Sequence, residues 1–321
     1  MVAPELIALL LLATSSVGAA EALQTSFLPV RESYHLGEPI GIQLSLMNTG
    51  PGEVSIDFEY PDWIGTRFSC KNPDAVAVPG PADVDRPVRL LHLKPGQEYT
   101  RVIALNRYLT FKKPKRYAVQ FSAHFLQRGD VGFSATPLVK GEFAIDVLPG
   151  PVDKRRLGEH INAMASKDVL RVEDAVEMLL WAEDPIVIAP LEKAAKQVSR
   201  LGNDIVRALA KFFPDERAKS AILVVAIHGN ANALMAALAV YEAHKVNVPT
   251  KFTETVLSSG YGSKTYYMLA YLVKCGGPDE ASLVEPFRQD KNPLRRKLAE
   301  EFLTRLGRGQ PPQPAKGGAA K

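Results

Sequence analysis

Four residues in the last third of the chain combine aromatic and basic side chains at helical spacing. Lys264, Tyr267, Tyr271 and Lys274 are separated by 3, 4 and 3 residues, a spacing that places them on one stripe of a helix. Tyrosine has a large apolar area and a polar tip, and together with lysine it is typical of a binding surface. Tyr241 and Lys245 of the preceding segment are expected on the same concave side. The predicted stripe is therefore Tyr241, Lys245, Lys264, Tyr267, Tyr271 and Lys274, and a structural contact between helices is the alternative.

No arrangement of residues indicates catalysis. The six histidines are scattered without an HExxH motif or a close pair, so we expect no metal site. The chain also lacks a Gly-x-Ser-x-Gly elbow, a glycine-rich phosphate loop and a Cys-x-x-Cys motif. Tyr241 and Lys245 have the Tyr-x-x-x-Lys spacing of short-chain dehydrogenases, but the glycine-rich dinucleotide turn that this chemistry needs is missing. We expect no catalytic residue and no cofactor.

The charge of the chain indicates no nucleic-acid partner. The formal net charge is +4, with only +1 over residues 23–150 and +2 over 151–307, which is too little for a basic binding face. The densest basic run, Lys112 to Arg116, lies between two predicted strands, where charged side chains usually face water. The two cysteines, Cys70 and Cys275, lie in different halves of the chain and do not form a disulfide framework.

The two ends of the chain have their own compositions. Residues 6–13 are apolar and are followed by small residues up to Ala22, so we predict a signal peptide over 1–22 that is cleaved after Ala20 or Ala22. The apolar run is much shorter than the ~20 residues of a membrane-spanning helix, and no membrane insertion is expected after cleavage. We therefore expect an exported protein, periplasmic or extracellular. Residues 308–321 contain few apolar side chains and are predicted to be a disordered tail.

Residues 23–150 alternate between apolar and polar side chains. The clearest strand places Tyr117, Val119 and Phe121 on one face and Gln120 and Ser122 on the other, as expected for a half-buried strand. Similar runs begin near residues 40, 54 and 143 and are separated by glycine- and proline-containing turns. About seven such strands without helical spacing predict an immunoglobulin-like β-sandwich.

Residues 151–307 have helical periodicity instead. Pro185, Pro214, Pro249 and Pro278 follow one another at intervals of 29, 35 and 29 residues, and proline is typical of the first position of a helix. A repeat of this length indicates an array of helix pairs, an α-solenoid. We place the pairs at 153–182, 185–213, 214–245, 249–275 and 278–306, after a boundary at residues 149–151.

Short motifs in both halves resemble known families. Residues 34–40 and 93–97 resemble the turns of bacterial Ig-like modules, including the BsuPI-type proteinase-inhibitor domain, and residues 113–119 resemble the approach to a tyrosine corner. Asp184-Pro185-Ile186-Val187 and the segment 292–299 resemble the Asp-Pro-x-Val-Arg-x-x-Ala signature of HEAT-like repeats, with Asn292 in place of the aspartate. The resemblance implies a β-sandwich followed by HEAT-like helical repeats.

These observations favour a non-enzymatic scaffold that binds a protein partner. Arrays of helical repeats commonly present extended binding surfaces. Two alternatives remain: a protease-inhibitor or regulatory module that acts through a loop of the sandwich, and a hydrolase whose site is assembled from distant residues. The position of the ligand would distinguish the three.

Overall fold

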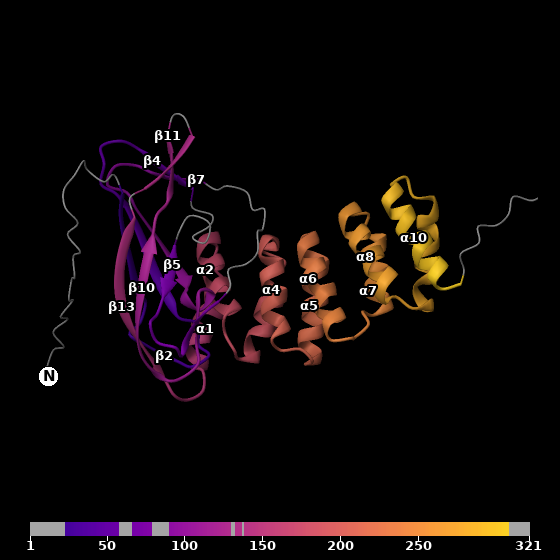
Figure 1. The fold of residues 1–321 in the computed structure, drawn as a ribbon, viewed down its shortest axis with the longest axis horizontal. Helices are drawn as coiled ribbons and strands as arrows, with labels where there is room; N and C mark the ends of the chain where they lie inside the picture. Colours follow the sequence, from indigo (N-terminus) through magenta and orange to yellow (C-terminus); the bar gives the residue numbers. More distant parts are fainter. Residues whose placement is uncertain (1–22, 58–65, 79–89, 130–131, 137, 308–321) are drawn as a thin grey trace, which may run out of the picture. The chain divides into compact units, whose positions relative to one another are not determined.

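The computed structural model describes residues 23–57, 66–78, 90–129, 132–136 and 138–307 (Figure 1). The predicted signal peptide, 1–22, and the predicted tail, 308–321, lie outside the described residues. The chain divides into two compact units. The β-rich unit extends to His160 and includes Trp181–Glu183, and the helical unit contains Ile161–Leu180 and the residues from Asp184 onward.

The β-rich unit is built from short strands in four sheets. Their order is β1-β3-β8, β2-β13-β10-β5, β12-β11-β4-β7 and β6-β9, and β2 pairs with β13 in parallel. The described strands are β1 (Leu23–Pro29), β2 (Ser33–His35), β3 (Gly41–Asn48), β4 (Val54–Asp57), β5 (Arg67–Ser69), β6 (Ala75–Ala77), β7 (Leu90–Leu93), β8 (Glu98–Ala104), β9 (Leu109–Phe111), β10 (Lys115–Ala123), β11 (Leu126–Gly129), β12 (Gly132–Ala135) and β13 (Val139–Leu148). The strands are more numerous and shorter than the seven that the sequence predicts, because turns interrupt several apolar runs.

One hydrophobic core joins these sheets. The predicted inward residues of β3, Ile42, Leu44 and Leu46, are fully buried, and so are Tyr117 and Val119 of β10. The same core includes side chains of β1, β5, β9 and β13. The alternation of apolar and polar residues therefore identified the buried face correctly.

Tyr117 forms the hydrogen bond of a tyrosine corner. Its hydroxyl donates to the carbonyl oxygen of Lys113 at 2.7 Å, four residues upstream, as in Ig-like domains. The predicted turn at residues 36–39 is also present: Gly37 has a φ of +84°, a conformation that glycine adopts without a steric penalty.

The described residues after β13 are mainly helical (Figure 1). The α-helices are α1 (Lys154–Ala163), α2 (Val169–Leu180), α3 (Ile188–Ala194), α4 (Gly202–Ala210), α5 (Glu216–His228), α6 (Ala231–Ala243), α7 (Thr250–Ser258), α8 (Gly262–Cys275), α9 (Ala281–Val284) and α10 (Pro293–Arg305). Short 3₁₀ helices occur at Leu105–Arg107, Pro185–Val187, Ser199–Leu201, Pro278–Glu280 and Glu285–Gln289. The helices fall within the five predicted pairs.

The helices of the helical unit pack in succession along two rows. In one row α2 contacts α4, α4 contacts α6, α6 contacts α8 and α8 contacts α10. In the other row α3 contacts α5 and α5 contacts α7. Helices α4, α6 and α8 thus each lie between two other helices of the first row, and Figure 1 shows α4, α6, α8 and α10 in this order.

Neighbouring helices of the first row are joined near their C-terminal ends by residues 31 to 33 positions apart. Lys211 Nζ donates to the carbonyl oxygen of Leu180 at 2.9 Å, and Arg305 donates to that of Leu272 at 2.9 Å. Two further contacts have the same spacing: the rings of Phe213 and His244 stack at 4.1 Å, and Lys274 pairs with Glu242 at 3.8 Å. The spacing agrees with the proline interval and reflects one repeated packing geometry.

The predicted role of the prolines is only partly correct. Pro185 and Pro278 occupy the first positions of 3₁₀ turns that lead into α3 and α9. Pro249 instead lies one residue earlier, as the N-cap of α7, and Pro214 precedes Asp215, whose side chain caps α5. Each proline marks a helix start, but its position in the first turn varies.

The boundary between the units differs from the predicted one at residues 149–151. Most of α1 belongs to the β-rich unit, because Glu38, only 2 % exposed, binds its first turn. The carboxylate accepts from the backbone N–H of Asp153 at 2.8 Å and from the guanidinium of Arg156 at 3.1 Å. The division therefore falls after His160.

Two further features concern export and redox state. No helix in the described part of the chain is both long and apolar enough to cross a membrane. Cys70 and Cys275 are free thiols, each partly exposed.

Candidate binding sites

The structure separates the six residues of the predicted stripe into two groups. Tyr241, Lys264 and Tyr271 are buried, with 2 %, 7 % and 6 % of their surfaces exposed. Tyr267 is half-buried, and Lys245 and Lys274 are exposed. The six residues therefore do not form one continuous exposed stripe, because α8 packs against α6, α7 and α10 and buries most of its circumference.

Lys264 caps a neighbouring helix. Its ammonium donates to the carbonyl oxygens of Ala226 at 3.1 Å and Ile227 at 2.6 Å, in the last turn of α5. These carbonyls have no partner within the helix and carry its negative dipole end, so a cation is favourable there. Burial lowers the pKa of Lys264 below its usual value.

Tyr241 and Tyr271 also have packing roles. The Tyr241 hydroxyl donates to the carbonyl oxygen of Lys219 at 3.1 Å, and its ring meets that of Phe213 edge-on at 5.5 Å. Burial raises the pKa of Tyr241 to about 12 and also raises the pKa of Tyr271. Tyr241 and Tyr271 are therefore packing residues in the interior of the helical unit.

Helices α6 and α8 each carry apolar side chains that are not fully buried. On α6, Met235 is 43 % exposed, and Ala236 and Ala239 follow it on the side opposite the buried residues. On α8, Tyr266 and Tyr267 are half-buried and their rings meet at 5.4 Å. We call these residues, Met235, Ala236, Ala239, Tyr266 and Tyr267, the α6–α8 face. Tyr267 belongs to the stripe predicted from the sequence. Tyr266 was not predicted, because it lies one position before the residues that the 3- and 4-residue spacing selects.

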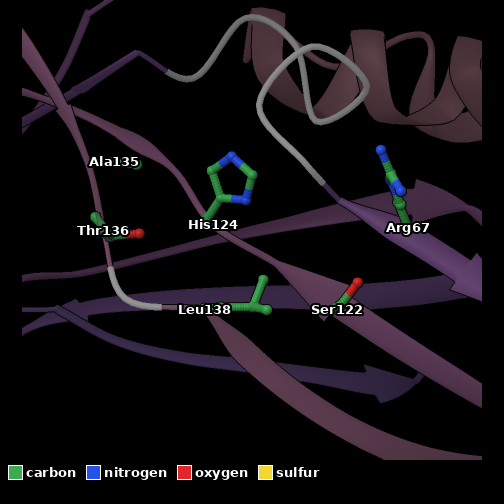
Figure 2. Close-up of a pocket in the computed structure, with 6 residues that line it drawn as sticks. All are labelled: Arg67, Ser122, His124, Ala135, Thr136 and Leu138. Carbon is green, nitrogen blue, oxygen red and sulfur yellow. The ribbon is translucent and has the colours of Figure 1, made fainter.

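The β-rich unit has a hollow of about 400 Å³ (Figure 2). Figure 2 shows Arg67 on β5, Ser122 on β10, His124 just after β10, and Ala135, Thr136 and Leu138 around the connection from β12 to β13. The volume is within the range of small-molecule sites, ~300–1,000 Å³. The sequence pattern predicts Ser122 on the outward face of its strand but indicates no role for it.

Strand register places cations around Ser122. Ser122 lies opposite Arg67 of β5 and, on its other side, opposite Lys140 of β13. Directly opposed side chains have Cβ atoms ~4.5–5.5 Å apart. Figure 2 shows the Ser122 hydroxyl and the His124 ring pointing apart, an arrangement that lacks the hydrogen bond of an activated serine nucleophile.

Comparisons with known proteins show no family. No family model and no curated protein sequence matches the chain. Among solved structures, native Escherichia coli alpha-2-macroglobulin is 9 % identical with a TM-score of 0.25, and the match covers 91 % of this chain and 21 % of that one. A fragment of the same protein from domain MG7 to the C-terminus is 9 % identical with a TM-score of 0.26, over 90 % of this chain and 53 % of the fragment. A mutant Salmonella alpha-2-macroglobulin is 10 % identical with a TM-score of 0.26, over 92 % of this chain and 27 % of that one.

The chain spans between about a fifth and about half of the length of these structures. Because the TM-scores are so low, the architecture and sites described above rest on the structure of this chain alone.

Proposed function

We propose that this protein is an exported, non-enzymatic scaffold that binds a protein partner through the α6–α8 face. The observation that carries the proposal is that an exposed methionine, Met235, and two half-buried tyrosines, Tyr266 and Tyr267, lie on adjacent helices of one row. Tyrosine and methionine are enriched in protein interfaces, and buried tyrosines are frequent hot spots. A partner that covers this face would remove two half-buried aromatic rings from water.

The composition of the face supports a protein partner. Between Asn232 and Val240, α6 contains no charged residue, so its exposed side is formed by small and apolar groups. The ion pair between Lys274 and Glu242 lies toward the C-terminal ends of the two helices. An apolar centre with charged groups beside it is the usual anatomy of a protein interface.

The scaffold classification is part of the proposal. The 31-to-33-residue contacts and the two rows of helices support an α-solenoid of HEAT-like pairs. The shared core and the Tyr117 corner support an Ig-like sandwich in the β-rich unit.

Export is proposed from the apolar segment 6–13 and the small residues after it. N-terminal sequencing of the mature protein tests this proposal, and we expect the mature chain to start within about two residues of 19–21. The BsuPI-type inhibitor and hydrolase alternatives stay predictions.

Affinity capture with matched variants tests the binding face. Tagged full-length protein, recovered from the exporting cell, is compared with a Tyr266→Ala/Tyr267→Ala variant and with Leu294→Ala, which removes another exposed apolar side chain, on α10. We expect the wild type and Leu294→Ala to retain the same partner and the double variant to lose it, since aromatic hot spots contribute ~2 kcal/mol or more. Equal recovery by all three proteins, with unchanged circular dichroism, would exclude the α6–α8 face.

A further inference from the structure

Arg67 is a cationic residue that lines the hollow of the β-rich unit, and a second cation, Lys140, lies opposite Ser122 on the next strand. The side chains of Arg67, Lys140 and Ser122, and the ring of His124, form no hydrogen bond or ion pair with another described residue. The nearest acid on the same face of β13, Glu142, already accepts from the Gln120 amide at 3.1 Å. This amide bond leaves the charge of Glu142 in place, but the carboxylate forms no ion pair with Arg67 or Lys140, so both cations remain available to an anion.

The opposite side of the hollow is apolar. Leu138 is 53 % exposed, and Ala135 beside it is exposed as well. Thr136 is already engaged, because its hydroxyl accepts from the backbone N–H of Phe125 at 2.8 Å. Exposed apolar groups that face a set of free donors define a ligand with two ends, one anionic and one apolar.

The geometry points to a binding site for a carboxylate with a short apolar body, in which Arg67 and Ser122 hold the carboxylate and Leu138 contacts the body. A guanidinium pairs with a carboxylate through two parallel hydrogen bonds. The Ser122 hydroxyl supplies a third donor, and an imidazole N–H of His124 can supply a fourth. Lys140 adds positive charge from the next strand. A phosphate would fit the cations but not the apolar wall.

Two sources share this chemistry: a free branched-chain acid and the C-terminal carboxylate of a peptide that ends in an aliphatic residue. The strands that supply Arg67, Ser122 and Lys140 belong to one sheet, so the donors are held on a rigid support. The site lies in the β-rich unit and is independent of the α6–α8 face, so the failure of either proposal leaves the other in place.

Calorimetric titration of the full-length protein tests the site. The probes are 4-methylpentanoate, its amide, a pentapeptide that ends in leucine, and the same peptide with an amidated C-terminus. We expect saturable binding of a carboxylate form and at least about tenfold weaker binding of the matching amide, because a charge-assisted hydrogen bond is lost. Tighter binding of the peptide acid than of 4-methylpentanoate assigns the site to peptide C-termini, and equal or weaker binding assigns it to free acids.

Variants of exposed residues complete the test. Arg67→Gln is expected to weaken carboxylate binding by about tenfold or more, and Arg67→Lys by less, because lysine keeps the charge but loses the planar fork. Lys94→Gln, which removes an exposed cation from the turn after β7, is the control and is expected to bind as the wild type does. Equal affinity for acid and amide, unchanged affinity in Arg67→Gln, or no saturation at ~10 mM carboxylate would overturn the proposal.

Discussion

Tyr267 and Tyr271 show how two residues of one helical stripe take different roles. They are four positions apart on α8, yet Tyr271 is 6 % exposed and Tyr267 is half-buried. The neighbouring helices α6, α7 and α10 cover Tyr271, so this side chain packs in the interior. Tyr267 is only half-buried, and its ring contacts that of Tyr266. A side chain's spacing identifies its stripe, and the neighbouring helices decide whether it is exposed.

Alanine substitution is expected to separate these two tyrosines. Tyr271→Ala should lower the free energy of unfolding by about 3 to 5 kcal/mol, because it leaves a cavity where a large side chain was buried. Tyr267→Ala should lower it by about 1 kcal/mol or less. Urea unfolding of both variants measures the difference. Similar losses would show that Tyr267 is also a packing residue and would weaken its role in binding.

The helices of the helical unit are held together near their C-terminal ends. Lys211, Lys264 and Arg305 each donate to carbonyl oxygens at the end of another helix. These carbonyls lack partners within their own helices, and a basic group also interacts favourably with the dipole. Lys264, which belongs to the predicted binding stripe, therefore joins one helix to another.

Lys264 makes this contact sensitive to pH. Because burial lowers the pKa of Lys264 in the folded protein, the unfolded chain binds more protons between that pKa and the usual 10.5. The free energy of unfolding of the wild type, compared with that of a Lys264→Met variant, should therefore rise with pH across this interval. Below this interval, the difference in free energy of unfolding between the two proteins should be constant. Urea unfolding at a series of pH values measures it.

Lys274→Met is the matched control, because Lys274 lies on the same helix with its side chain 66 % exposed. We expect its stability to follow the wild type in parallel as the pH rises. A wild type that loses stability relative to Lys264→Met over the same interval would show that the folded protein favours the charged form of Lys264.

One buried carboxylate, that of Glu38, connects α1 to the β-rich unit. Glu38 accepts from the backbone N–H groups of His35 and Asp153 and pairs with Arg156. The pair connects the turn before β3 to the first turn of α1. The β-rich unit is therefore expected to need residues beyond the linker at 149–151.

Two fragments test this boundary. A fragment of residues 23–150 lacks Asp153 and Arg156, so Glu38 would lose two of its three partners, and breaking a buried pair costs ~3–5 kcal/mol. We expect it to unfold at a clearly lower urea concentration than a fragment of residues 23–163. The control is Arg155→Ala in the longer fragment, which changes an exposed neighbour and should have no effect. Equal midpoints for the two lengths would restore the boundary at 149–151.

Local patterns in the sequence predicted most of the fold. Alternation identified the buried residues of β3 and β10, and the proline interval located four of the five helix pairs, because these signals depend on neighbours along the chain. The short strands β5 and β6 could not be predicted, since three residues carry too little periodicity. The boundary at His160 was missed because Glu38 and Arg156 are 118 residues apart.

The sequence by itself determined which half of the chain forms strands and which forms helices, where the turn at residues 36–39 lies, and that tyrosines and lysines follow one stripe of α8. Only the tertiary structure decided that Lys264 and Tyr271 are interior and that Tyr266 and Tyr267 are half-buried beside each other at the surface. The tertiary structure also places Arg67 opposite Ser122, although the two residues are 55 positions apart in the chain. The physical reason is that periodicity reports the direction of a side chain from its own backbone. Exposure and the grouping of charges depend on which distant strand or helix packs beside it.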